Sequence, residues 1–436
     1  MLRAARGSVL LRIVALGATM TTSVVLARAL GPVAYGTYAY VFAIVTLLAL
    51  PSQVGIPILL IRETAKAQAH EDWPRLKGLW VWAIRTIILT SLALGFVTAV
   101  AIVLCGNRID ADLRWTLVAG MALVPLIALG NACGAALNGL RLVVRGQLPD
   151  SVIRPLLLVS FVGIAWVVGG QMSAPATMLW HALAAAIAFV VGGLILWCAR
   201  PQGLATVAAD TTHSRNWWRA ALPLALITGL QVMGSESGMI LLGIFRREAD
   251  VGEYKVAISA AALALFGLQT VNLVIAPHIA RVHALGDRPK LQRLASVGAL
   301  ASVALTLPVF LLFVAAGQWI IKFLYGSAYV GAYGPLLILA VGQMVNAFFG
   351  LNAGLMSMTG HERDAARWLT ISAGSAIVIG LLLIPVLGMM GAALAYAISM
   401  AVWNIAFWWV VMKKVGIDSS LRGVFHAGFL KSIQRG

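Results

Sequence analysis

Charged residues are scarce in this chain of 436 residues. Asp, Glu, Lys and Arg make up 11% of the sequence, hydrophobic residues make up 61%, and the mean hydropathy is +0.93. A soluble domain needs more polar surface than this composition can supply. The apolar runs are also too long for the strands of a membrane β-barrel, which span about ten residues each. The composition therefore indicates an all-α integral membrane protein.

The usual motifs of metal sites, disulfide frameworks and nucleotide hydrolysis are also missing. The three cysteines, Cys105, Cys133 and Cys198, lie far apart and form no C-x-x-C pair. The seven histidines show no H-x-x-H or H-E-x-x-H spacing, and there is no nucleotide-binding P-loop. We therefore predict no cofactor and no metal, and expect any energy coupling to use a proton or sodium gradient.

The apolar runs predict about twelve transmembrane helices, since each needs roughly 20 apolar residues to cross a bilayer. The connections between them are short, so we expect no soluble domain. The predicted spans are 8–29, 35–61, 78–104, 115–138, 149–170, 176–198, 220–245, 251–277, 293–316, 333–357, 366–387 and 389–411.

The distribution of basic residues predicts the orientation of these spans. Lys and Arg outnumber Asp and Glu by 32 to 15. If the N-terminus is cytoplasmic, 22 of the 32 basic residues fall on the cytoplasmic side and 7 on the other side. This asymmetry is typical of membrane proteins. It explains the net charge of +17 without a nucleic-acid partner, and it predicts that both termini are cytoplasmic.

Short repeats suggest that the chain is an internal duplication. A G-x-Y turn at Gly36–Tyr38 recurs at Gly252–Tyr254, Gly134 matches Gly350, and Asn131 matches Asn346 at nearly the same offset. We therefore predict an N-terminal six-helix lobe and a C-terminal one, joined by a cytoplasmic linker. A basic cytoplasmic tail would lie against membrane lipids. These four regions are 1–198, 220–411, 199–219 and 412–436.

Several short motifs follow one another along the chain. They are 26–32 (LARALGP), 35–38 (YGTY), 55–57 (GIP), 62–65 (RETA), 324–326 (LYG) with Tyr329, 384–388 (IPVLG) and 391–393 (GAA). In this order and spacing they resemble Wzx-type polysaccharide and O-antigen flippases of the multidrug/oligosaccharidyl-lipid/polysaccharide (MOP) exporter superfamily. The resemblance extends to about residue 411.

The resemblance implies a V-shaped bundle of two lobes around a central cavity. It also implies an isoprenyl (undecaprenyl)-pyrophosphate-linked oligosaccharide as substrate, moved across the bacterial inner membrane for polysaccharide, O-antigen or lipopolysaccharide biosynthesis. Polysaccharide polymerase and assembly proteins would be its partners.

Carrying pyrophosphate through a bilayer requires cations that replace water, so the basic residues within spans are candidates. Arg12 shares a helical face with Thr19, Thr22 and Ser23, which is the pattern of a cavity-lining stripe. The alternative is that Arg12 reaches the headgroups. Arg85 lies deep in an otherwise apolar face. Arg154 follows Asp150 at i,i+4, so a local ion pair is the alternative to a substrate contact.

Glu236 is the acidic residue that we predict near the centre of a span, where it could bind a coupling ion, pair with an arginine, or form a neutral hydrogen bond between helices. Further polar candidates are Lys255 on the eighth span, Asn131 and Asn138 on the fourth, and Asn346 on the tenth. These amides could contact sugars or hydrogen-bond between helices.

Two other functions fit the sequence less well. A cation-coupled multidrug antiporter of the same superfamily would need an anionic cavity, whereas the spans hold more cations than carboxylates. A membrane-embedded glycan polymerase or glycosyltransferase would need a large catalytic loop, and the predicted outer loops are short. A transporter, not an enzyme, is the favoured interpretation.

Overall fold

The fold was analysed in a computed structural model that describes residues 2–105, 110–169 and 172–425. Over these residues the chain forms α-helices with short 3₁₀ and π segments and no strand. In the part of the chain that the structure describes, eleven helical segments are long and apolar enough to cross a membrane. The first of them, Val9–Gln53, contains a non-helical residue, Gly31. The sequence-based prediction of an all-α membrane protein is therefore confirmed.

The chain divides into two compact units, Met1–Val232 and Met233–Gly436. Helix α9 (Ser214–Phe245) contains the boundary between them. This boundary lies beyond the predicted linker at 199–219, and the functional division into two six-helix lobes stays a prediction.

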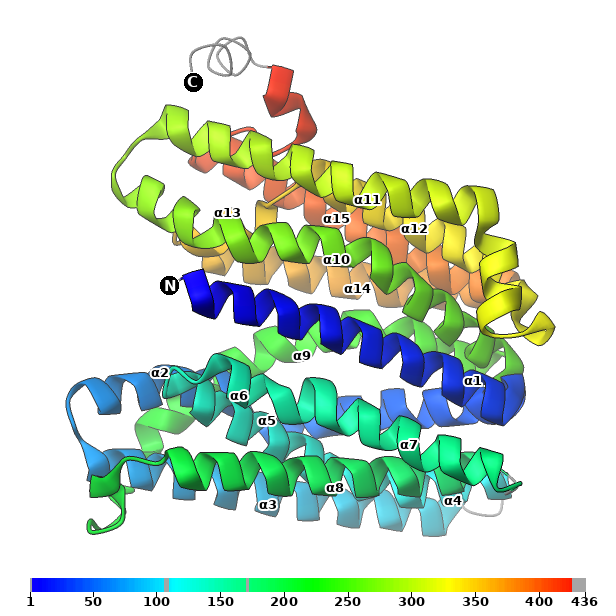
Figure 1. Cartoon of the computed structure of the whole chain (residues 1–436), viewed down its shortest axis with the longest axis horizontal. Coiled ribbons are helices and arrows are strands. Elements are labelled where there is room, and N and C mark those ends of the chain that lie inside the picture. Colours follow the sequence, from blue (N-terminus) through cyan, green and yellow to red (C-terminus); the bar gives the residue numbers. More distant parts are fainter. Residues whose placement is uncertain (1, 106–109, 170–171, 426–436) are drawn as a thin grey trace. The chain divides into compact units, whose positions relative to one another are not determined.

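Unit 1 is a bundle (Figure 1) in which α5 (Leu123–Gly139) contacts α1, α2, α3, α4, α6 and α8. Its remaining elements are α1 (Leu2–Gln53), α2 (Ile56–Ala69), α3 (Trp73–Cys105), α4 (Ala111–Met121), α6 (Val143–Leu148), the π-helical η2 (Pro149–Ile153), α7 (Arg154–Val167), α8 (Ala174–Ala199), η3 (Gln202–Leu204) and the first part of α9.

Unit 2 is a second bundle, in which α12 (Tyr333–Phe349) packs against α10, α11 and α15. Its other elements are the rest of α9, α10 (Glu248–Ala284), α11 (Arg288–Leu324), η4 (Ser327–Ala332), α13 (Asn352–Met358), α14 (Glu362–Leu387), α15 (Met389–Lys414) and η5 (Leu421–Phe425).

Glycines break three of these helical runs. Gly31 has a non-helical backbone (φ 71°, ψ 173°) and precedes Pro32, so α1 contains two segments, as the predicted spans 8–29 and 35–61 require. The second prediction is wrong at its end, because the turn at Val54 and Gly55 separates α1 from α2. The predicted span 333–357 is likewise interrupted at Gly350 (φ 67°), between α12 and α13.

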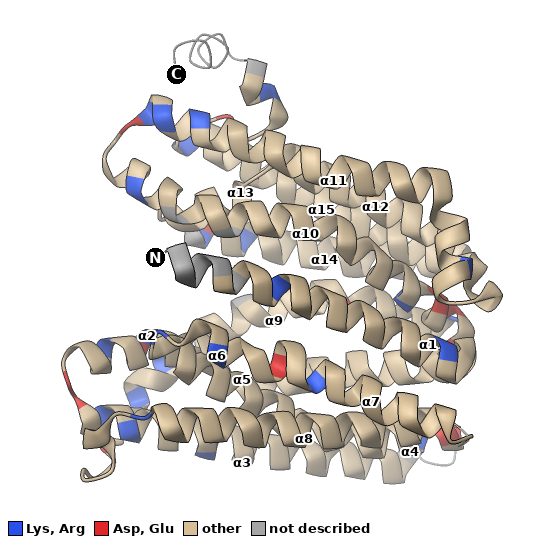
Figure 2. Cartoon of the chain, in the orientation of Figure 1, with Lys and Arg blue, Asp and Glu red and all other residues tan. Residues whose placement is uncertain are grey.

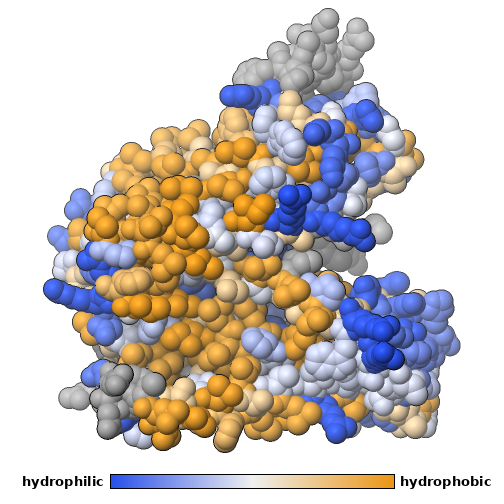
Figure 3. All heavy atoms as spheres, turned by 180° about the vertical axis from the view of Figure 1, so that it is seen from behind, coloured by the Kyte–Doolittle hydropathy of each residue, from blue (hydrophilic) through white to orange (hydrophobic). Residues whose placement is uncertain are grey.

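The surface has the polarity expected of a membrane protein. Lys, Arg, Asp and Glu gather mainly toward the helix ends (Figure 2), and broad hydrophobic surface covers the helix middles (Figure 3). Exposed aliphatic side chains along α3 include Ile88 (42%) and Leu92 (66%), which in water would be unfavourable but in a bilayer face lipid. Multi-pass membrane insertion follows from this pattern.

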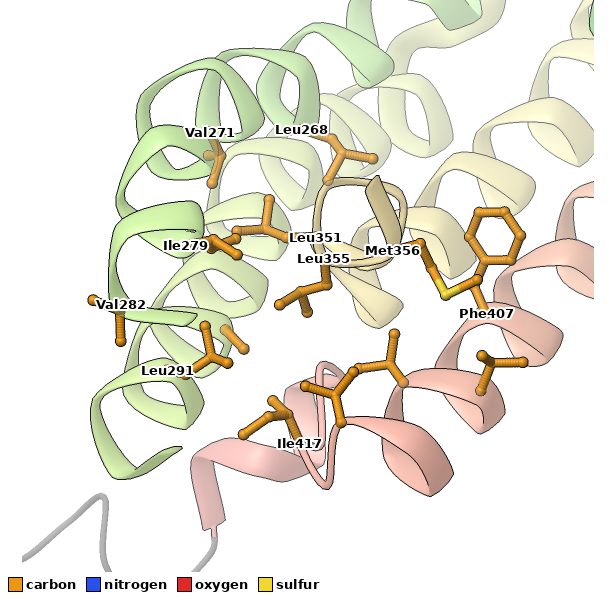
Figure 4. Close-up of a cluster of buried hydrophobic side chains, with 14 residues drawn as sticks. Leu268, Val271, Ile279, Val282, Leu291, Leu351, Leu355, Met356, Phe407 and Ile417 are labelled. Carbon is orange, nitrogen blue, oxygen red and sulfur yellow. The ribbon is translucent and has the colours of Figure 1, made fainter. Parts of the chain in front are cut away.

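The C-terminal segment after α15 is part of the core of unit 2. Ile417 belongs to a buried apolar cluster with side chains of α10, α11, α13 and α15 (Figure 4). Gln292 of α11 holds the next residue by two hydrogen bonds, accepting from Asp418 N at 2.8 Å and donating to Asp418 O at 2.7 Å. The segment 415–425 therefore packs on unit 2, contact of the basic tail with headgroups stays a prediction, and 426–436 lie outside the described residues.

Candidate functional site

Unit 1 contains a polar cavity of about 260 Å³ between its helices. Residues from the end of α1, from α2, α5, α6, η2 and α9 line it, and all of them precede the boundary at Val232. The polar side chains in its wall are mostly amides and hydroxyls: Gln53, Asn131, Asn138, Gln147, Asp150, Ser151 and Thr228. The cavity thus offers hydrogen-bond donors and acceptors within a membrane-spanning bundle.

The turn at Gly55 forms one wall of this cavity. Gly55 has a left-handed backbone (φ 67°), and Pro57 starts α2 directly after it. A side-chain carbon on Gly55 would lie 2.4 Å from the carbonyl oxygen of Ala221 in α9. Only glycine permits both this backbone and this close contact. The turn therefore fixes α2 against the first half of α9.

A second close contact brings α5 and α6 together. A side-chain carbon on Gly134 would lie 2.7 Å from Gly146 O, and one on Gly146 would lie 2.7 Å from Gly134 O. The two backbones therefore meet without intervening side chains. Asn131 and Asn138 each lie one turn from this contact on α5, and Asp150 lies one turn from it on the other segment. The crossing therefore gathers polar groups around the cavity.

The two predicted asparagines of α5 both line the cavity. Asn131 donates from Nδ2 to Gln53 Oε1 at 3.1 Å, which joins α5 to α1 as a helix–helix hydrogen bond. Asn138 Oδ1 is buried and accepts no hydrogen bond from the described residues. Buried polar atoms in proteins nearly always have a partner, so Asn138 is the side chain of this cavity best placed to accept a hydrogen bond from a ligand.

Asp150 and Arg154 form an ion pair at the edge of the cavity, with Oδ1 3.0 Å from Nη1. The local ion pair that the i,i+4 spacing predicts is confirmed. Asp150 lies in the π-helical turn η2, an irregularity that occurs frequently at functional sites. Because Asp150 is paired with Arg154, its carboxylate adds no isolated negative charge to the cavity.

Glu236 lies in unit 2, near the start of that unit in α9. Its electrostatic partners there are Lys255 and Tyr254 of α10 and Tyr396 of α15. A side-chain carbon on Gly238 would lie 3.0 Å from the Tyr254 hydroxyl, so α9 and α10 pack closely beside the carboxyl group. Two residues that the sequence predicted as candidates, Glu236 and Lys255, therefore interact electrostatically within unit 2.

A comparison of the sequence with known protein families identifies the family of this chain. Residues 7–283 match the family described as polysaccharide biosynthesis protein. The chain belongs to this polysaccharide biosynthesis protein family.

A curated relative of this chain is a probable low-salt glycan biosynthesis flippase, Agl15, from Haloferax volcanii. It is 25% identical over 249 residues, which are 55% of this chain and 51% of the relative. The chain therefore spans about half the length of the curated relative that it matches.

Solved structures show the same fold. The lipid II flippase MurJ in an inward closed conformation matches with a TM-score of 0.73 and 14% identity, over 100% of this chain and 93% of MurJ. An inward-facing multidrug resistance MATE family transporter of the MOP superfamily matches with a TM-score of 0.69 and 15% identity, over 92% and 95%. These matches show that the chain has the fold of these two transporters, and the family match at 7–283 confirms the resemblance to polysaccharide biosynthesis proteins.

Arg12 does not line the polar cavity of unit 1. Of the polar residues on its helical face, Thr19 donates to Ala15 O, and Thr22 donates to Ala18 O and, at 3.3 Å, to Pro155 O of α7. The Ser23 hydroxyl lies 3.1 Å from the Tyr35 hydroxyl. A contact of Arg12 with substrate stays a prediction.

Arg85 is exposed on α3, next to exposed Ile84, Ile88 and Leu89, and is absent from the cavity wall. The prediction of a cavity position for Arg85 is therefore unsupported, because hydropathy does not tell which side of a helix faces lipid. Asn346 is buried in unit 2 and donates to Gln343 of its own helix at 3.4 Å. Their contact with substrate stays a prediction.

A buried contact between a histidine and a tyrosine in unit 1 was not used in the predictions from the sequence. His181 of α8 lies with Nδ1 2.8 Å from the hydroxyl of Tyr38 in α1, and Phe42 stacks on its ring. His181 is the histidine that the sequence places inside a span, which was the available signal. Its partner Tyr38 belongs to the G-x-Y turn used for the duplication argument.

Proposed function

We propose that the protein is a flippase for an isoprenyl (undecaprenyl)-pyrophosphate-linked oligosaccharide, acting in polysaccharide or O-antigen biosynthesis in the bacterial inner membrane. The observation that carries the proposal is the cavity wall of unit 1, which is rich in amides and hydroxyls. In this wall, the buried Oδ1 of Asn138 accepts no hydrogen bond from the described residues. Sugar hydroxyls are donors for such acceptors, and family membership supports a glycan substrate.

The mechanism that we propose starts with the sugars entering the cavity from the cytoplasmic side. Asn131 and Asn138 would exchange hydrogen bonds with water for hydrogen bonds with hydroxyls, which reduces the cost of desolvation. Arg154 and further basic residues would stabilise the pyrophosphate, while the isoprenyl chain stays in lipid. No covalent bond changes in this process, so the protein would act as a transporter and not as an enzyme.

A multidrug antiporter is the second candidate, because MATE transporters share the fold. Export of a cationic drug requires an anionic site. The carboxylate in the cavity wall of unit 1, Asp150, is neutralised by Arg154 at 3.0 Å. This pairing favours the glycan over the cationic drug.

The deciding experiment deletes the gene and measures lipid-linked oligosaccharide in the two leaflets of the inner membrane. We expect oligosaccharide to accumulate on the cytoplasmic leaflet and surface glycan to be lost, with recovery on complementation. If surface glycan is unchanged and sensitivity to cationic drugs increases, the antiporter is correct instead.

Asn138→Leu is expected to reduce glycan export about tenfold, because one hydrogen bond to a buried polar group is worth about 1–2 kcal/mol. Complemented deletion strains would be assayed for surface glycan, with the amount of protein in the membrane measured in parallel. Asn138→Ser keeps a short acceptor and should retain more activity. Normal export by Asn138→Leu would remove this side chain from the site.

Glu236→Gln tests the proposal that Glu236 binds the coupling ion. The amide keeps the shape but cannot be ionised, so we expect export to fall about tenfold or more and to stop responding to the ion gradient. Transport into inverted vesicles, with the proton or the sodium gradient collapsed in turn, identifies the ion. Glu248→Gln, an exposed change at the start of α10, is the matched control and should behave as the unaltered protein.

A further inference from the structure

Unit 1 has a second, larger hollow that differs in character from the polar cavity. It has a volume of about 520 Å³ and lies between α2, α3, α5 and α8. Apart from the residues at one end, its wall is formed by aliphatic, aromatic and small side chains, among them Leu60, Ile84, Ile88, Leu129 and Phe189. Because Ile84 and Ile88 are also 48% and 42% exposed, this apolar groove is open to the surface that faces lipid.

Helix α5 separates the apolar groove from the polar cavity. Asn131, Gly134 and Asn138 line the cavity, whereas Leu129, Ala132, Cys133 and Ala136 line the groove. Each set repeats at three and four residues, so the two sets occupy opposite faces of one helix. An α-helix with its side chains is about 10 Å thick, so a phosphate at the cavity and one at the groove would occupy different places.

One end of the groove carries a cation that lies over an indole ring. Arg200, the charged residue in the groove wall, follows the end of α8, and its guanidinium carbon lies 3.5 Å from the centre of the Trp197 ring. Trp80 of α3 lines the same hollow. Tryptophan favours the headgroup level of a membrane, so Arg200 lies where the phosphate of a lipid would lie.

The connection from α8 to α9 closes this end and holds it in place. Leu204 of η3 lines the groove, and Gly203 packs so closely on Trp73 that a side-chain carbon would lie 2.6 Å from its ring. Lys77 Nζ donates to Val207 O at 2.7 Å, and Asp210 N donates to Pro74 O at 3.0 Å. The Arg200 end is therefore a built structure and not a free loop.

We propose that the groove binds an anionic phospholipid, with one acyl chain along its apolar wall and the phosphate on Arg200. The apolar wall suits a hydrocarbon chain, and a guanidinium binds phosphate oxygens through paired donors. Among the described residues, the groove wall contains the cation Arg200 and no carboxylate. This positive charge selects an anionic headgroup. Since α5 lies between groove and cavity, this lipid is a resident of unit 1 and not the transported substrate.

The test measures lipids that remain bound to the full-length protein in native mass spectrometry. Protein purified in detergent is titrated with phosphatidylglycerol or with phosphatidylcholine of the same acyl chains. We expect tighter binding of phosphatidylglycerol, and about fivefold weaker binding after Arg200→Gln, as expected for one lost basic residue near a membrane surface. Arg200→Lys should keep most of the preference, and the exposed Arg145→Gln on α6 is the matched control.

A second pair of variants tests the apolar wall. Gly193 lines the groove, and a side-chain carbon added there would meet no atom within 4 Å. Gly193→Leu should therefore fill the groove, abolish binding of both phospholipids and leave the protein folded, while Gly193→Ala should still bind. Thermal unfolding of each variant is recorded to verify folding.

Two results would overturn the proposal. Equal binding of both phospholipids that Arg200→Gln does not change would mean that no anionic headgroup is recognised. Displacement of phosphatidylglycerol by a polyprenyl phosphate at equal concentration would assign the groove to an isoprenyl chain. Neither result would overturn the flippase proposal. That proposal is tested by glycan export and rests on the polar cavity on the other side of α5.

Discussion

Gly55→Ala is expected to remove most of the folded protein from the membrane. Gly55 has φ 67°, and its new side-chain carbon would lie 2.4 Å from Ala221 O and 2.6 Å from Ala225 N, both backbone atoms that cannot rotate away. The backbone strain and the forced separation of α2 from α9 together cost about 2–4 kcal/mol. Thermal unfolding of the purified protein and its yield from membranes measure this loss.

Gly286 and Gly130 provide matched controls for this change. Gly286 also has a positive φ, 71°, but no atom within 4 Å of an added carbon, so Gly286→Ala should show only the backbone cost of about 1 kcal/mol. Gly130 lies inside α5, in the cavity wall and also without close neighbours, and Gly130→Ala should be neutral or stabilising. If all three variants unfold at the same temperature, the close contact of the Gly55 turn has no energetic weight.

Asp150→Asn is the second change with a large expected effect, because it leaves Arg154 with 18% of its side chain exposed and without its carboxylate. Removing one partner of a buried ion pair costs about 3–5 kcal/mol. Since Asp150 is 40% exposed, we expect less here, about 1–3 kcal/mol, together with a loss of glycan export that exceeds the loss of protein.

The double variant Asp150→Asn with Arg154→Gln separates stability from transport. It removes both charges, so it should recover most of the thermal stability. Export should remain low if Arg154 stabilises the pyrophosphate. Full recovery of export would show that the ion pair is structural only and that the substrate finds its cations elsewhere.

Composition and periodicity were sufficient to predict the fold class, because a bilayer allows few solutions to a sequence this apolar. The breaks at Gly55 and Gly350 were missed for a physical reason. Hydropathy is unchanged across both glycines, whereas their left-handed backbones end one helix and start another. The burial of Ser419 was also missed, since its partner Asn352 lies far away in the sequence.

The candidate site was predictable only along single helices. The spacing of Asn131 and Asn138 placed both on one face, and Asp150 and Arg154 pair at the distance that their spacing predicts. What the sequence could not give is which helices meet, since the crossing at Gly134 and Gly146 depends on contacts between backbones. The same limit explains why the sequence could not tell that Arg85, a candidate cavity residue, is exposed on α3.

The hydrogen bonds between Gln292 and Asp418 have a consequence for biosynthesis. Gln292 is inserted early in the synthesis of unit 2, but its partner is made only after α15. Domains generally fold as units during synthesis, beginning at the N-terminus. Unit 1 can therefore finish folding while unit 2 is being made, whereas unit 2 must wait for the segment that follows α15. A stop codon just before Asp418 would leave a full set of inserted helices without the segment that completes their packing.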